Sequence, residues 1–152
     1  MLAVAVPNTR AYAVNAIAFL LLCAAFSLLP ILGSHKIHDD KDYSVWYAAG
    51  QVIRAGAALY PHTPGARLEY MYPPFAADVI AAPLSLLHFP VFVILCELAN
   101  IAAWIASCIL AVYLVTGRAW FQHPLLYSLP VIVTAPYVWD VFLLGQINLF
   151  LL

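Results

Sequence analysis

Charged residues are scarce in this sequence. Only 9% of its 152 residues are Asp, Glu, Lys or Arg, whereas 66% are hydrophobic. A soluble globular domain averages about 25% charged and roughly 45–50% apolar residues, so the composition excludes a soluble single domain and a disordered tail. The six Lys and Arg residues provide no basic surface, so we expect no nucleic-acid partner. We predict an all-α integral membrane protein with membrane lipid around it.

Cysteine is also rare. Cys23, Cys96 and Cys108 each lie inside an apolar stretch, which excludes a disulfide-stapled secreted module and favours buried apolar side chains. His35 and His38 stand beside acidic residues, but this is a weak pattern for metal ligands and is more typical of a solvated polar turn. We therefore expect no metal and no cofactor.

The few charges are concentrated in one segment. Of the six basic and seven acidic residues, nine lie between residues 36 and 78. Residues 12–33 carry no formal charge and match the roughly 20 residues that a membrane-spanning helix needs. We predict a first span over about 12–33, followed by a polar loop over 34–73. The span is expected to remain as an anchor, because the apolar region of a cleaved signal peptide has only about 7–15 residues.

The region after the loop is again apolar. Glu97 is the single charge within residues 79–117, a stretch about twice as long as one span requires. Pro83 and Pro90 provide breaks, because proline lacks the helical N–H donor. We predict a short helix over 74–87, a turn at 88–90, a span over 91–115, a turn at Gly117-Arg118 and a further membrane segment over 125–152, interrupted at Asp140 and at 145–148. Because that segment stops inside an apolar run, we expect a truncated, N-terminal portion of one longer transmembrane domain.

The polar loop contains a predicted surface helix. Tyr43, Trp46 and Tyr47 follow Asp42 at helical spacing, and Gly56 is a plausible C-terminal stop. Aromatic rings with polar tips settle at the headgroup level, so this helix is expected to lie along the membrane surface.

Two interpretations of the acids before this helix, Asp39, Asp40 and Asp42, stay open. One is helix capping or solvation. The other is a general base at the membrane boundary, where partial desolvation raises the pKa of a carboxyl group and makes it a stronger base.

Polar residues elsewhere also have two readings. Tyr70 and Tyr72, before Pro73-Pro74, are either interfacial anchors or a substrate wall. The amides of Gln146 and Asn148 either bind sugar hydroxyls or join helices, and Asn100 and Ser107 are expected to make helix-packing contacts. Three isolated acids, Asp78, Glu97 and Asp140, would form the polar pathway in the alternative function, a non-catalytic multi-span membrane protein or transporter piece.

Six short motifs, in this order, resemble glycosyltransferase family 87, the polyprenol-phosphate-mannose-dependent alpha-mannosyltransferases. The similarity runs from about Asp42 to the last residue. The motifs are Asp42-Tyr43, Tyr47-Ala48-Ala49, Gly56 with Leu59-Tyr60, Tyr70-Met71-Tyr72-Pro73-Pro74, Ala82-Pro83-Leu84 and Gly145-Gln146-Ile147-Asn148.

The resemblance implies a GT-C-like bundle of transmembrane helices whose exoplasmic first loop carries the surface helix. Because members of the family are several hundred residues long, it also implies that this chain is inactive on its own. It implies transfer of a hexose, mannose, from a polyprenyl-phosphate donor to a lipid-linked, glycan or glycolipid acceptor, without a metal. An arabinofuranosyl donor is an alternative within similar folds. Asp42 would be the general base, with Asp39 and Asp40 as fallbacks, and the substrate-binding residues would be Tyr47, Tyr72, Gln146 and Asn148.

The resemblance also implies an orientation. The N-terminus would be cytoplasmic and the first loop exoplasmic, in a bacterial-type plasma membrane. Counting Lys and Arg alone gives the opposite result, because four of the six lie in the loop.

Overall fold

The computed structural model describes residues 9–33, 42–60, 70–117 and 123–147, and these residues form helices joined by turns, without a strand. The helices are α1 (Thr9–Gly33), α2 (Asp42–Arg54), α3 (Pro74–Ala76), η1 (Ala77–Ala81), α4 (Ala82–Leu84), α5 (Phe89–Thr116) and α6 (Pro124–Leu144). The predicted all-α class is therefore confirmed for the described part of the chain.

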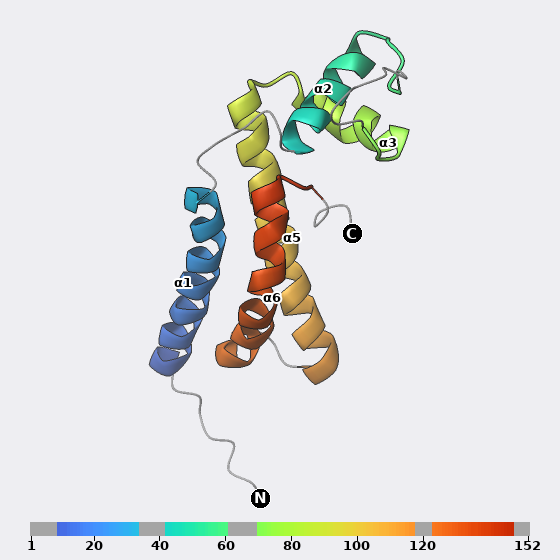
Figure 1. Cartoon of the computed structure of the whole chain (residues 1–152). Coiled ribbons are helices and arrows are strands. Elements are labelled where there is room, and N and C mark those ends of the chain that lie inside the picture. The colour runs from blue at the N-terminus through green and yellow to red at the C-terminus, as the bar shows by residue number, and fades with distance from the viewer. Residues whose placement is uncertain (1–8, 34–41, 61–69, 118–122, 148–152) are drawn as a thin grey trace, which may run out of the picture.

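Three long helices form a bundle, and the short helices gather at one end of it. Figure 1 shows α1, α5 and α6 running along the bundle, with α2 and α3 at the end where α1 finishes and α5 begins. Since α6 runs back along α5, its C-terminal end also lies at this end (Figure 1). Segments far apart in sequence, 42–60, 70–88 and 145–147, are thus brought to one end of the molecule.

Two of the long helices have the length and composition of membrane spans. Phe89–Thr116 and Leu125–Leu144 pass this test, and only 17% and 22% of their most apolar stretches are buried. A core helix of a soluble protein would be mostly buried, whereas these helices expose side chains such as Leu114 and Val115. The finding supports membrane association. In α1 the described apolar part, Tyr12–Leu28, is shorter than a full span, so that its crossing stays a prediction.

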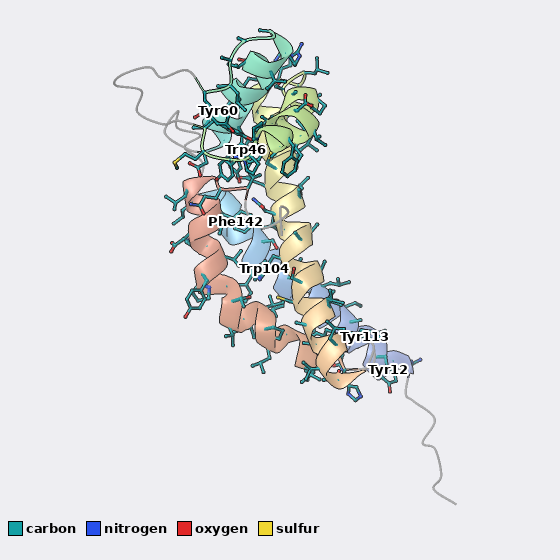
Figure 2. All side chains as sticks on the ribbon, turned by 90° about the vertical axis from the view of Figure 1, so that its right-hand side faces the viewer. Tyr12, Trp46, Tyr60, Trp104, Tyr113 and Phe142 are labelled. Atoms are coloured by element: carbon teal, nitrogen blue, oxygen red, sulfur yellow. The ribbon has the colours of Figure 1, made fainter. Side chains whose placement is uncertain are left out.

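Aromatic residues with polar tips lie near both ends of the bundle. In Figure 2, Trp46 and Tyr60 lie at one end and Tyr12 and Tyr113 at the other, while Trp104 and Phe142 lie between them. Tyr and Trp prefer the two membrane–water interfaces, so this distribution fits a bundle that crosses a bilayer.

The helix boundaries follow from glycine and proline, with two differences from expectation. The turn that was predicted at 88–90 lies at 85–88 instead. Helix α5 begins at Phe89 and has Pro90 in its first turn, where a backbone N–H would have no acceptor within the helix, so proline costs no hydrogen bond there. Asp140 was expected to interrupt its segment, but α6 continues through it because an exposed carboxylate leaves the backbone hydrogen bonds intact.

The end of α6 is set by Gly145, which has a φ of 69°. Its N–H donates to the Phe142 carbonyl oxygen, and the N–H of Gln146 donates to the Val141 carbonyl oxygen. This pair of bonds is the Schellman motif, in which glycine adopts the left-handed conformation without steric cost.

The buried side chains form two clusters. The lower cluster joins the three long helices: Phe19, Cys23, Trp104, Cys108, Tyr127, Val131, Ala135, Val138 and Phe142. The upper cluster joins the short helices to α5 and to the turn after α6: Tyr43, Trp46, Ala49, Tyr70, Ala76, Ala77, Ala81, Phe92, Val93, Cys96 and Ile147. Since α5 contributes to both, the end carrying the short helices is continuous with the bundle.

Candidate functional site

Asp42 and Tyr72, two of the predicted site residues, are in contact. Asp42 is in the first turn of α2 and is partly buried. The hydroxyl of Tyr72 donates a hydrogen bond to Oδ2 of Asp42 at 3.3 Å. A carboxylate in the first turn of a helix is also favoured by the helix dipole. The predicted helix start at Asp42 is confirmed. Tyr72 lies 30 residues later in the sequence.

Aromatic rings surround this pair. Tyr72 packs on Trp46, with 4.7 Å between ring centroids, and on Tyr70, with 5.6 Å. Trp46 meets Tyr70 edge-on at 5.5 Å and is fully buried. The hydroxyl of Tyr60 donates to the backbone carbonyl oxygen of Tyr72 at 2.7 Å. The ring contacts and the hydrogen bond to the backbone carbonyl oxygen together hold Tyr72 in place.

Burial changes the acidity of the tyrosines at this end. It raises the pKa of Tyr72, with a further increase from the neighbouring Asp42 carboxylate. Burial, followed by the neighbouring Tyr60 and Tyr72, raises the pKa of Tyr70 to about 12. Both side chains are therefore neutral hydroxyl donors at physiological pH.

Tyr47, another residue of α2, contacts the segment around the start of α5. Its hydroxyl donates to the Leu87 carbonyl oxygen at 2.9 Å, and its ring meets Phe89 and Phe92 edge-on at 5.2 and 5.3 Å. These contacts tie α2 to the start of α5. Its predicted contact with substrate stays a prediction.

A close contact holds α2 on the helical segment that begins at Pro74 and consists of α3, η1 and α4. A Cβ atom added at Gly50 would lie 2.3 Å from the carbonyl oxygen of Ala81 and 2.9 Å from Cβ of Ser85. The facing segment is a π turn, in which the N–H of Ala82 donates to the carbonyl oxygen of Ala77, five residues back. Arg54 then donates from Nη1 to the Ser85 carbonyl oxygen at 3.3 Å. The sequence predicted a helix here but gave no sign of the π turn or of the Gly50 contact.

The turn after α6 reaches the same end. Nδ2 of Asn100 donates to the backbone carbonyl oxygen of Gln146 at 2.7 Å, and Ile147 is fully buried in the same cluster as Tyr43 and Trp46. The expected packing role of Asn100 is confirmed, whereas Ser107 is exposed on α5. Because the backbone of Gln146 makes this contact, the proposed role of its side-chain amide stays a prediction. Asn148, Asp39 and Asp40 lie outside the described residues.

The three isolated acids occupy different environments. Glu97 is buried in α5, whereas Asp78 and Asp140 are exposed on two other helices. They therefore do not form one buried set. Glu97 lies near Tyr43, whose pKa is raised first by burial and then by this acid.

Within the described ranges, no group of three or more His, Cys, Asp or Glu side chains is arranged to hold a metal ion.

Comparison with known proteins identifies part of this arrangement. The family model for glycosyltransferase family 87 matches residues 70–152, more than half of the chain. The match includes Tyr72, the π turn, Asn100 and the 145–148 motif, whereas Asp42 lies before it. No curated protein matches the chain, and no solved structure matches it either.

Proposed function

Because the chain belongs to glycosyltransferase family 87, we propose that it acts as a membrane glycosyltransferase that transfers a hexose, mannose, from a polyprenyl-phosphate donor to a lipid-linked or glycan acceptor. The observation that carries the proposal is the gathering of Asp42, Tyr72 and the 145–147 turn at one end of an apolar bundle. A lipid-linked donor carries its phosphate at the headgroup level. The end of the bundle that carries Trp46 and Tyr60 would lie at this level.

The proposed reaction is a direct displacement at the anomeric carbon. Asp42 accepts the proton of the acceptor hydroxyl, and the acceptor oxygen forms a bond to the anomeric carbon. The bond from this carbon to the phosphate oxygen breaks, and polyprenyl phosphate leaves with the electron pair. A phosphate is stable as an anion, so its departure needs no strong acid.

Asp42 is suited to this role by its surroundings. It belongs to a helix held on the bundle by the Gly50 contact and by the hydrogen bonds of Tyr47 and Arg54. A general base has to meet the acceptor hydroxyl at hydrogen-bond distance, so a fixed depth relative to the lipid donor favours the reaction. We further propose that this end is exoplasmic, with the N-terminus cytoplasmic, in a bacterial-type plasma membrane.

The experiment is a transfer assay in membranes with the protein expressed from its complete reading frame. We expect radiolabelled mannose to move from polyprenyl-phosphate mannose into an acceptor glycan or glycolipid, and not from a nucleotide-linked mannose. Polyprenyl-phosphate arabinofuranose serves as the competing donor. Transfer from the nucleotide sugar alone, or from neither lipid donor, would contradict the proposal.

A further inference from the structure

We infer that Tyr72 is a positioning residue for Asp42: its hydroxyl orients the carboxylate of the base, in place of the substrate contact expected from the family resemblance. The inference rests on the proposed function of Asp42.

The first support is the hydrogen bond itself. The Tyr72 hydroxyl donates to Oδ2 of Asp42 at 3.3 Å, across 30 residues of sequence. In the described part of the chain, Tyr72 is the side chain that hydrogen-bonds the Asp42 carboxylate through Oδ2. A carboxylate has about four lone-pair sites on its two oxygens, so this bond does not use up its capacity to receive the acceptor proton.

The second support is that Tyr72 is fixed by the protein without a substrate. Its ring packs on Trp46, which follows Asp42 by one helical turn and therefore lies on the same face of α2. Its backbone carbonyl oxygen receives the hydrogen bond from Tyr60. Helix α2 therefore carries both Asp42, which is the base, and Trp46, whose ring holds the hydrogen-bond donor Tyr72 against Asp42.

The third support is the chemistry of the donor. A hydrogen bond to a carboxylate stabilises the ionised form, which is the form that acts as a base. Among the described residues, the titratable groups on this side of Asp42 are Tyr72 and, behind it, Tyr70 and Tyr60. Arg54 is at the opposite end of the 13-residue helix, and Glu97 faces Tyr43. Tyr72 is therefore the described titratable group that acts on the Asp42 carboxylate through a direct hydrogen bond.

The test compares Tyr72→Phe with Tyr70→Phe. Both variants keep an aromatic ring in the same cluster, but the Tyr70 hydroxyl donates to the Pro73 carbonyl oxygen and not to Asp42. The hydrogen bond is followed at neutral pH by the NMR signal of the Asp42 carboxyl carbon, in protein labelled with ¹³C at Asp side chains, and Asp42→Asn identifies the signal. We expect Tyr72→Phe to move this signal and Tyr70→Phe to leave it in place, because the Tyr72 hydroxyl donates to Oδ2 of Asp42.

A second readout separates kcat from KM in the transfer assay. In Tyr72→Phe we expect kcat to fall about threefold to tenfold, as for the loss of one hydrogen bond, while the donor KM stays unchanged. An unmoved Asp42 signal, or a raised donor KM with an unchanged kcat, would overturn the inference and favour a substrate contact. The proposed function fails separately, if Asp42→Asn retains full transfer, and the NMR measurement does not require an active enzyme.

Discussion

Gly50 provides the sharpest test of how α2 is held on the bundle. It lies in the middle of an α-helix, and at an exposed helical position Gly→Ala is expected to stabilise a protein by about 1 kcal/mol. Here the expected sign is opposite. The added Cβ would lie 2.3 Å from the carbonyl oxygen of Ala81 and 2.6 Å from its carbonyl carbon, so the obstacle is backbone and not a flexible side chain.

The magnitude follows from the movement required. To reach ordinary van der Waals distance, α2 has to move away from the π turn by roughly 1 Å. Overpacking of this kind costs about 1–3 kcal/mol, and the helix-propensity gain offsets about 1 kcal/mol. Because backbone is involved, we place the cost at the upper end and expect Gly50→Ala to lower the free energy of unfolding by about 1–2 kcal/mol.

The assay is unfolding of the full chain in mixed detergent micelles, followed by circular dichroism. Gln51 is the matched control, since it is the next residue on α2 and is exposed. Comparing Gln51→Gly with Gln51→Ala measures helix propensity without the contact, and alanine should be the more stable by about 1 kcal/mol. If Gly50→Ala stabilises the protein by a similar amount, the close contact with Ala81 is not present.

Two further predictions concern the same end of the molecule. Asn100→Leu removes the donor that holds the Gln146 carbonyl oxygen, so it should lower the free energy of unfolding by about 1–3 kcal/mol. The control Ser107→Ala, at an exposed position of α5, should change the free energy of unfolding by less than about 0.5 kcal/mol. Equal effects of the two substitutions would contradict the hydrogen bond. The pKa of Tyr70 is raised from 10.0 to about 12, so the fold favours its protonated form. This contribution is complete below pH 10 and is lost as the pH rises through about 12. The unfolding midpoint should therefore fall over this range while tyrosinate absorbance rises, and Tyr70→Phe should reduce the fall in the midpoint. An identical fall in this variant would contradict the assignment.

The helices were predictable because their signals are local. Gly117 and Gly145 end two helices at positive φ, at positions that the sequence had marked as a turn and a polar interruption. The start at Asp42 followed from an acid before a run of aromatics at helical spacing. Asp140 misled the prediction because charge was treated as a break, although an exposed carboxylate leaves the backbone hydrogen bonds of a helix intact. Helix α6 continues through Asp140 and also through Pro130 and Pro136.

The site was predictable only as a set of residues. The sequence named Asp42, Tyr72 and the 145–148 motif, but not that the Tyr72 hydroxyl reaches Asp42 or that Ile147 belongs to the same buried cluster as Trp46. Such pairings depend on how α2 lies on α4 and η1, and this is set by contacts between segments distant in sequence. Tyr47 shows the same limit. The family resemblance implied a substrate contact, which stays a prediction, but gave no sign that its hydroxyl and ring bind α2 to Leu87, Phe89 and Phe92.

The most direct test of the central claim is transfer from polyprenyl-phosphate mannose by three aspartate variants measured side by side. If Asp42 is the general base, Asp42→Asn should reduce kcat at least about 100-fold, the lower limit for loss of a general base. Asp39→Asn and Asp40→Asn should stay within a few-fold of the unchanged protein, with all three proteins unfolding at the same temperature. Full transfer by a folded Asp42→Asn variant, or a comparable loss in Asp39→Asn or Asp40→Asn instead, would contradict the assignment of Asp42 as the base.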